Sequence, residues 1–151
     1  GLYLVNTRLG QTDAASRAFG RLVDFGLEQQ RLAVKFLFRP GSTGFVAERR
    51  LSGAYPMWLT EIARSAAARE ACVEVAGHAS RSGPEPLNER LSLLRAEAVR
   101  GLLVANDARL ATRTIATGYG SRETMVGTGR DDASDAMDRR VEFRVVNCAR
   151  A

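Results

Sequence analysis

The sequence predicts an α/β (α+β) two-layer sandwich, in which helices cover one mixed sheet. Segments with strand-like alternation of apolar residues are separated by segments with helical spacing, and the last strand is free to fold back beside the earlier ones. A chain of 151 residues with 45% hydrophobic and 26% charged residues can bury one core. We expect a helical extension over residues 1–30 and a domain over residues 31–151 with the order β-α-β-α-β-β.

The first half of the chain predicts two helices and a strand. Apolar residues at helical spacing indicate a helix from Asp13 to Gln30, and alternation indicates a strand from Leu32 to Phe38. The glycine-rich and proline-containing segment Arg39–Gly44 ends regular structure. Pro56 suits the first turn of a helix, and the residues after it continue a helical stripe to Ala68.

The second half predicts three strands around a long helix. A strand is expected from Cys72 to Ala76 and the strongest helix of the sequence from Leu87 to Val104. A strand from Arg113 to Tyr119 is followed by a glycine-rich, acidic loop from Ser121 to Met137. The last strand is expected from Arg140 to Val146.

The helix from Leu87 has two distinguishable faces at about 100° per residue. Asn88, Ser92 and Arg95 lie together on one flank, where the preceding strand ends. Beside them runs an apolar stripe that we expect to be the core-facing side: Leu87, Leu91, Leu94, Ala98 and Leu102.

Arg95 is the candidate ligand-binding residue that this flank provides. From its position it can reach the loop between Gly77 and Gly83, and such a meeting of strand end, loop and helix flank is a common place for a ligand site. The alternative is that Arg95 pairs with Glu85 or Glu89, or binds a loop carbonyl.

Two cysteines stand at opposite ends of two predicted strands. Cys72 begins one strand and Cys148 follows the other. If these strands pair antiparallel, the two residues lie side by side, as a disulfide requires, and an oxidising compartment would permit the bond. Two buried free thiols are the alternative.

The basic balance does not by itself identify a partner. The net charge is +5 and the pI about 10.0, which suits anionic partners. The basic residues are scattered and Lys35 is the only lysine, so an arginine-rich genome explains the bias equally well, and nucleic acid is not expected as a partner. No segment approaches the roughly 18 consecutive apolar residues of a membrane span. The chain begins with Gly1, so we expect a longer protein whose anchoring segment lies outside these residues.

Three short motifs define the resemblance of this chain to a known family. They are Gly77-His78-Ala79-Ser80, Leu91-Ser92 followed by Arg95-Ala96, and Asp138-Arg139-Arg140-Val141-Glu142. They resemble glycine-histidine-threonine-aspartate, leucine-serine-x-x-arginine-alanine and asparagine-arginine-arginine-valine-glutamate of the OmpA-like (OmpA/MotB/Pal-type) peptidoglycan-associated domains of bacterial envelope proteins. The resemblance extends from about Leu32 to Val146.

The resemblance implies a non-catalytic domain that binds the diaminopimelate of the peptidoglycan stem peptide. Carried over by position, the helix arginine that meets the ligand carboxylate is Arg95, the strand-end acceptor is Ser80, and the tail arginine that lines the pocket is Arg139. A zwitterionic ligand needs a guanidinium for its carboxylate and an acceptor for its ammonium. Asn88 lies on the same helix flank as Arg95.

Two departures from the family pattern make the expected pocket more positive. Ser80 stands where the family has an aspartate, and Arg39 stands where many relatives have one. Asp138 replaces the asparagine of the tail motif, so it is a candidate for a relocated acceptor. The alternative for Asp138 is a surface pair with Arg139 or Arg140.

These residues predict a periplasmic, membrane-anchored envelope module that tethers a larger protein to peptidoglycan or another anionic wall component. The alternative is a structural or protein-interaction domain, for example in a homodimer or with other envelope proteins, that has lost the wall ligand. We expect no enzyme, cofactor or metal. His78 is the only histidine and suits a structural role, neither cysteine has a histidine at metal-ligand spacing, and the acidic run over residues 131–135 lacks the glycine and closing glutamate of a calcium loop.

Overall fold

A computed structural model describes the backbone of residues 2–30, 32–81, 83–123 and 137–150, and the side chains of residues 13–30, 32–81, 83–123 and 137–149. The elements in chain order are α1 (Leu2–Glu28), β1 (Phe36–Leu37), α2 (Arg49–Ser52), α3 (Tyr55–Ala68), β2 (Cys72–Gly77), α4 (Glu85–Asn106), the 3₁₀ helix η1 (Ala108–Thr112), β3 (Thr114–Gly118), β4 (Arg140–Val146) and the 3₁₀ helix η3 (Cys148–Arg150).

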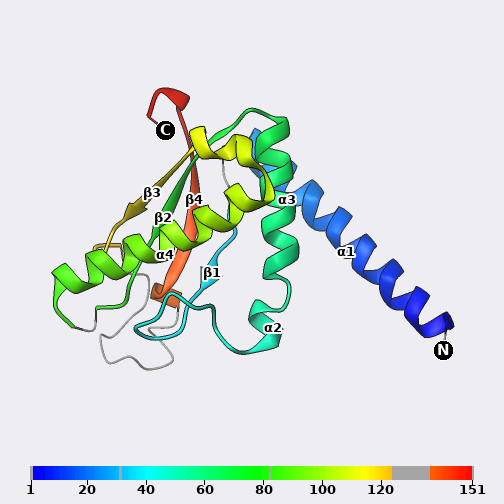
Figure 1. Cartoon of the computed structure of the whole chain (residues 1–151), viewed down its shortest axis with the longest axis horizontal. Coiled ribbons are helices and arrows are strands. Elements are labelled where there is room, and N and C mark those ends of the chain that lie inside the picture. The colour runs from blue at the N-terminus through cyan, green and yellow to red at the C-terminus, as the bar shows by residue number, and fades with distance from the viewer. Residues whose placement is uncertain (1, 31, 82, 124–136, 151) are drawn as a thin grey trace.

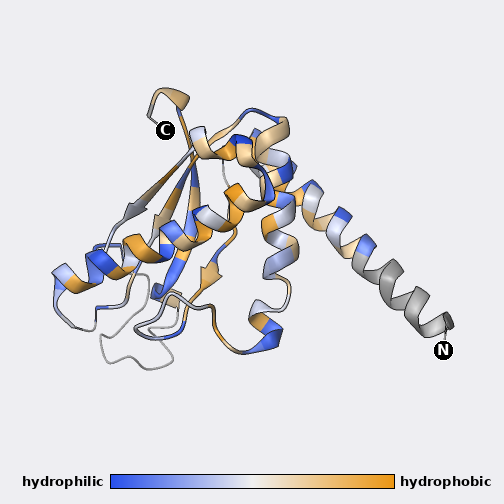
Figure 2. Cartoon of the chain, viewed as in Figure 1, coloured by the Kyte–Doolittle hydropathy of each residue, from blue (hydrophilic) through white to orange (hydrophobic). Residues whose placement is uncertain are grey.

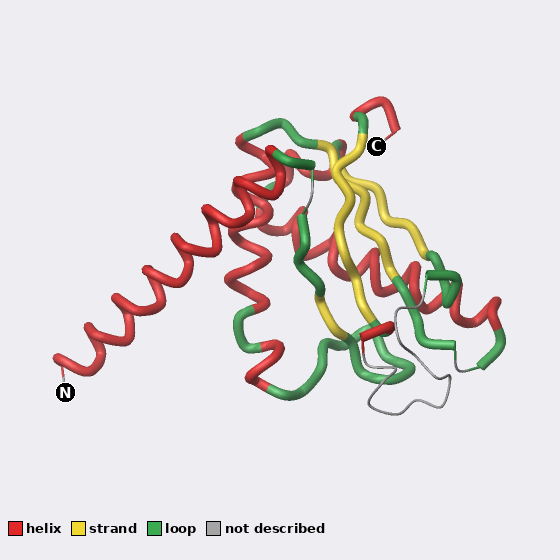
Figure 3. The backbone as a smooth tube through the Cα atoms, turned by 180° about the vertical axis from the view of Figure 1, so that it is seen from behind, coloured by secondary structure: helices red, strands yellow, loops and turns green. Residues whose placement is uncertain are grey.

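The four strands form one mixed sheet in the order β1-β4-β2-β3. β2 and β3 are parallel, and β4 runs antiparallel between β1 and β2. Helices α3 and α4 lie on one face of this sheet, and the view from behind shows the strands in front of them (Figures 1 and 3). The predicted two-layer fold with a mixed sheet and an additional N-terminal helix is therefore confirmed.

The N-terminal helix begins earlier than predicted and leaves the body of the domain (Figure 1). Its C-terminal half packs on α3, where the rings of Phe19 and Trp58 stack with centroids 5.4 Å apart. Val23 and Leu27 are buried in the main core. None of the helices that the structure describes is long and apolar enough to cross a membrane.

The first strand is much shorter than the predicted Leu32–Phe38. Only Phe36 and Leu37 pair with β4. Leu32 and Val34 are buried as the alternation predicted, but they pack into the core shared with α1 instead of joining the ladder. Tyr55 Oη accepts a hydrogen bond of 3.0 Å from Leu37 N, so an α3 side chain satisfies a backbone group of this edge strand.

Helix α4 turns a different face to the sheet from the one that the apolar stripe predicted. Leu87, Leu94 and Leu102 are 62%, 41% and 41% exposed. The buried residues of the helix are Asn88, Ser92, Arg95, Ala96, Val99 and Leu103. Hydrophobic and hydrophilic residues alternate along the helix in Figure 2. The flank with the polar motif residues is thus the inner face, and the predicted core stripe is wrong.

Two paired glycines explain why small and polar residues face the sheet here. Gly77 of β2 and Gly118 of β3 are neighbours in the parallel ladder. A Cβ added to Gly77 would lie 1.8 Å from Ser92 O, and one added to Gly118 would lie 2.6 Å from Leu93 N. The α4 backbone therefore rests directly on the strand ends, and no leucine side chain fits between them.

Replacing Gly77 should destabilise the fold because its Cβ would push backbone against backbone. We predict that Gly77→Ala lowers the free energy of unfolding by roughly 2 to 4 kcal/mol. Gly101→Ala is the matched control. Gly101 lies in α4, but a Cβ added to it would meet nothing within 4 Å. Gly101→Ala should raise the free energy of unfolding by about 0.5 to 1 kcal/mol, because alanine favours a helix interior more than glycine does. Urea unfolding followed by circular dichroism measures both, and an unchanged midpoint for Gly77→Ala would contradict the close approach.

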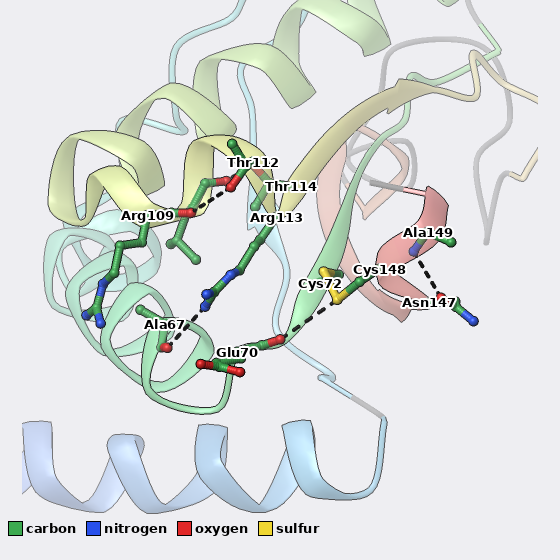
Figure 4. The surroundings of a disulfide bond; sticks show 11 residues. Ala67, Glu70, Cys72, Arg109, Thr112, Arg113, Thr114, Asn147, Cys148 and Ala149 are labelled. Atoms are coloured by element: carbon green, nitrogen blue, oxygen red, sulfur yellow. Dashed lines mark hydrogen bonds between the residues drawn. A yellow bond between two sulfur atoms is a disulfide. The ribbon is translucent and has the colours of Figure 1, made fainter.

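A disulfide joins Cys72 to Cys148 (Figure 4). It links the first residue of β2 to η3, directly after β4, where these antiparallel strands place their ends together. The two cysteines are 76 residues apart in sequence. Cross-links of this kind stabilise a domain by about 2 to 4 kcal/mol, largely by restricting the unfolded chain.

Candidate functional site

Three segments of the chain meet around a hollow of about 170 Å³ at the end of β2. The hollow brings together Ser80, Arg95 and Arg139, which belong to three separate sequence motifs, and Asn88, which was predicted on the same helix flank as Arg95. The described residues that line it are Gly41, Ala79, Ser80, Gly83, Pro84, Leu87, Asn88, Leu91, Arg95 and Arg139.

Arg95 is fully buried and binds two neighbouring segments through its guanidinium group. Nε donates to Ser42 O at 2.8 Å and Nη2 donates to Arg39 O at 3.0 Å. Nη1 donates to His78 O at 3.1 Å, at the end of β2. Of the alternatives considered for Arg95, binding of loop carbonyls is what the structure shows, while Glu85 and Glu89 have other partners.

These hydrogen bonds fix the guanidinium plane in a defined position. The Arg95 Cζ atom also lies 5.4 Å from the centroid of the Phe38 ring, which is a favourable place for a cation. A buried arginine held by several acceptors loses little further entropy when an anion binds beside it. Arg95 is therefore both a structural support of the hollow and a preformed positive group in its wall.

Asn88 and Ser92 occupy neighbouring positions on the inner face of α4 but differ in surroundings. Asn88 is 6% exposed, and its side chain contacts the Glu85 carboxylate, whose pKa it helps to lower. Ser92 Oγ accepts from Gly120 N at 2.9 Å and donates to Glu89 O at 2.8 Å, so it fixes the turn after β3. Asn88 thus places a buried amide group in the wall of the hollow, and Ser92 is structural.

The tail motif divides between the hollow and the interior. Arg139 lines the hollow, whereas Asp138 is fully buried, does not line it, and has Oδ1 3.7 Å from Arg140 Nη1. The contact of Asp138 with Arg140 is the alternative considered from the sequence, although it is buried and not on the surface. Arg39 contributes its carbonyl to Arg95, but its side chain is exposed and outside the lining.

A group of polar side chains on β2 and β4, and on the residues that directly follow β2 and β3, was not predicted from the sequence. Tyr119 Oη donates to Glu74 Oε1 at 2.9 Å, and Arg144 Cζ lies 4.5 Å from the Tyr119 ring centroid. The Tyr119 ring stacks on His78 with centroids 5.4 Å apart. Alternating charges at Glu74, Glu142 and Arg144 in otherwise apolar strands were the available signal for this network.

Glu142 connects this polar network to the strand end below the hollow. His78 Nε2 lies 3.2 Å from Glu142 Oε1, and Arg140 Nε donates to Oε2 at 3.2 Å. The contact with His78, together with the hydrogen bond from Arg140 and its positive charge, lowers the pKa of the Glu142 carboxyl from 4.5 to about 2. Folding therefore favours the ionised carboxylate.

This pKa shift predicts a loss of stability in acid. The Glu142 contribution is fully present above the unfolded pKa of about 4.5 and disappears as the pH falls toward 2, because protonation removes the charge that His78 and Arg140 stabilise. We predict that the stability difference between the parent and Glu142→Gln shrinks by roughly 1 to 2 kcal/mol between about pH 6 and pH 2, after allowance for partial exposure. Denaturant unfolding at several pH values measures it, and parallel pH profiles of the two proteins would argue against the shift.

A larger hollow of about 690 Å³ lies elsewhere, between α3 and α4. The described residues that line it include no charged side chain and none of the predicted site residues. Its lining consists of Phe45, Val46, Ala47, Ser52, Tyr55, Pro56, Leu59, Thr60, Leu102 and Asn106. The smaller hollow is therefore the candidate site for a charged ligand.

Comparison with known proteins places the chain in a family. Residues 37–137 match the OmpA family, and the chain belongs to it. This confirms the resemblance seen in the motifs. Domains of this family are non-catalytic binding modules of the cell envelope. The chain is therefore an OmpA-like, peptidoglycan-associated domain of the cell envelope. The expectation that it is not an enzyme agrees with this family.

Individual relatives agree with this assignment. Outer membrane porin F of Pseudomonas fluorescens is 41% identical over 73 residues, which are 48% of this chain and 22% of the porin. The chain thus spans about a fifth of the length of that curated relative.

Solved structures share the fold. The peptidoglycan-associated lipoprotein of Burkholderia pseudomallei has a TM-score of 0.61 and 23% identity, over 74% of this chain and 89% of that one. The cell wall anchor of the T6SS of Pseudomonas aeruginosa has a TM-score of 0.57 and 26% identity, over 84% and 95%. The C-terminal domain of MotB from Helicobacter pylori has a TM-score of 0.60 and 17% identity, over 77% and 86%.

Proposed function

We propose that this domain tethers a larger envelope protein to peptidoglycan by binding the diaminopimelate of a stem peptide in the hollow beside Arg95. The observation that carries the proposal is the convergence of Arg95, Arg139, Ser80 and Asn88 on one small hollow. Two arginines and an amide donor suit a carboxylate, because charge-assisted hydrogen bonds are the strong ones. In the proposed complex, the ligand carboxylate contacts the guanidinium groups of Arg95 and Arg139. The Ser80 hydroxyl accepts a hydrogen bond from the ligand nitrogen.

The preformed position of Arg95 supports this proposal. Its bonds to the carbonyls of Arg39, Ser42 and His78 exist without a ligand. Binding then requires little rearrangement of the wall, and less of the interaction energy is lost to ordering. Asp138 acts indirectly, by holding Arg140 beneath the strand end, and Arg139 completes the positive side of the hollow.

The second candidate is an envelope domain that kept the fold for structural or protein-interaction purposes and lost the wall ligand. Ser80 favours it, because a hydroxyl supplies no charge for an ammonium group. The three carbonyl bonds of Arg95 favour it as well, since they give this residue a structural purpose independent of any ligand. In both candidates, a segment outside these 151 residues supplies the membrane anchor.

Retention on purified peptidoglycan sacculi distinguishes the two candidates. We predict that the parent domain sediments with sacculi and that Arg95→Lys reduces the bound fraction about tenfold, because an ammonium keeps the charge but cannot reproduce the planar fork. Arg90→Ala is the matched control: Arg90 is an exposed arginine of the same helix outside the hollow, and its loss should leave retention unchanged.

A second variant covers the case in which Arg95→Lys does not fold. Leu87 is 62% exposed and lines the hollow, so Leu87→Glu adds a negative charge at the rim without touching the bonds of Arg95. It should weaken retention by repelling the ligand carboxylate. A parent domain that stays in the supernatant would favour the structural candidate, and equal retention of the parent and Leu87→Glu would place the contact elsewhere.

A further inference from the structure

The outward face of α1 carries exposed apolar side chains where the helix lies against the body of the domain. Leu22 and Phe25 are 59% and 62% exposed, although both are large and apolar. Ala15 and Ala18 are also exposed and continue this face toward the beginning of the helix. These four residues, which form the α1 patch, repeat at intervals of three and four positions. Such intervals are the spacing at which one helix packs along another.

A hollow of about 290 Å³ adjoins the α1 patch and lies between the helix and the segment that follows it. The described residues that line it are Leu22, Phe25, Gly26, Leu32, Ala33 and Val34. All of them are apolar. A contiguous apolar surface of this kind marks a place where a partner docks, because covering it removes apolar area from water.

Two opposite charges flank the α1 patch on one side of the helix. Arg21 and Glu28 are both exposed and lie two helical turns apart, at equivalent positions beside the patch. Glu28 Oε1 lies 2.9 Å from Arg69 Nη1, but the Glu28 side chain is 53% exposed, so its carboxylate can accept a second partner. The flank is therefore positive at one end of the patch and negative at the other.

This order of charges fits a second copy of α1 that runs in the opposite direction. In a parallel pair of helices, the charged flank of one copy lies beside the other flank of its neighbour, which carries Phe19 and Gly26 and offers neither charge a partner. In an antiparallel pair, the two charged flanks meet. Arg21 of each copy then faces Glu28 of the other, which gives two equivalent ion pairs around a two-fold axis.

The same antiparallel arrangement fits the apolar side chains. With the two-fold axis between Leu22 and Phe25, each Leu22 packs against Phe25 of the second copy. Ala15 and Ala18 of one copy then lie over the hollow of the other, where their small side chains allow a close approach. We propose that the α1 patch is the interface of an antiparallel homodimer of this chain. The proposal goes beyond the proposed function, because the patch shares no residue with the described lining of the hollow beside Arg95.

Sedimentation velocity of the 151-residue chain at increasing concentration tests for the dimer. We expect a dissociation constant between about 10 and 500 µM, because a single helix face of about three turns offers less area than the interface of a stable complex. Phe25→Ser should raise this constant at least about tenfold, since it removes a central apolar contact. Leu94→Ser is the matched control: Leu94 is 41% exposed on α4, outside the patch, and its loss should leave the dimer unchanged.

Exchange of the two flanking charges tests the direction of the helices. Arg21→Glu and Glu28→Arg should each raise the dissociation constant roughly 5- to 20-fold, because each places like charges opposite one another. The double variant carries both charges in exchanged positions and should bind more tightly than either single variant. A double variant that is weaker than both single variants would overturn the antiparallel pairing, because independent structural effects would only add.

Disulfide cross-linking tests the same arrangement through the backbone. The two native cysteines are joined to each other, so an introduced cysteine supplies the free thiol. Packing of Leu22 against Phe25 of the second copy places Ala18 of one copy beside Gln29 of the other. An oxidised mixture of Ala18→Cys and Gln29→Cys chains should therefore form the mixed dimer faster than either variant links to itself. Faster linking of Ala18→Cys to itself, as parallel packing requires, would overturn the proposal.

A parent chain that remains a monomer up to about 1 mM would also overturn it. If that monomer bound to phosphatidylglycerol vesicles and Phe25→Ser did not, the α1 patch would be assigned to a membrane surface instead. Neither result affects retention on sacculi by a single domain, so failure of the dimer and failure of the proposed function are distinguishable.

Discussion

The guanidinium group of Arg95 is the contact on which the candidate site depends. It lies in the interior, on the inner face of α4, and donates hydrogen bonds to the carbonyls of Ser42, His78 and Arg39. One side chain therefore fixes the loop after β1 and the end of β2 to the same helix. The hollow exists because these three segments are held at this spacing, and its positive character comes from the residue that holds them.

The close contact of α4 with the strand ends makes this geometry possible. Gly77 and Gly118 have no side chains to separate the helix from the sheet. Ser92 and Ala96 therefore lie directly over Gly77, and the backbone of Glu89 and Leu93 lies over Gly118. Polar residues can then occupy the inner face of the helix without leaving voids. The leucines of the predicted stripe are displaced outward, where Leu87 and Leu91 form part of the rim of the hollow.

The sequence predicted the strands and the family better than it predicted the packing. Strand β4 has the predicted bounds, and the motif residues Ser80, Arg95 and Arg139 meet at one hollow. Helical periodicity predicted the wrong buried face of α4 because it follows the positions of apolar residues. The close approach of the helix to Gly77 requires small residues on the buried face instead. The alternation of apolar residues could not show that residues 32–35 lie outside the strand, because packing against α1 buries alternate residues in the same way. The acidic loop predicted before β4 lies mostly outside the described residues.

Nitrogen-detected NMR of arginine and asparagine side chains during titration with a diaminopimelate stem peptide tests the central claim most directly. If the hollow is the binding site, the Nε signal of Arg95 and the Nδ2 signal of Asn88 shift with one common dissociation constant. The signals of Arg90 and Arg100, on the same helix but outside the lining, stay in place. Shifts confined to Asn106, in the apolar hollow between α3 and α4, with an unmoved Arg95, would contradict the account.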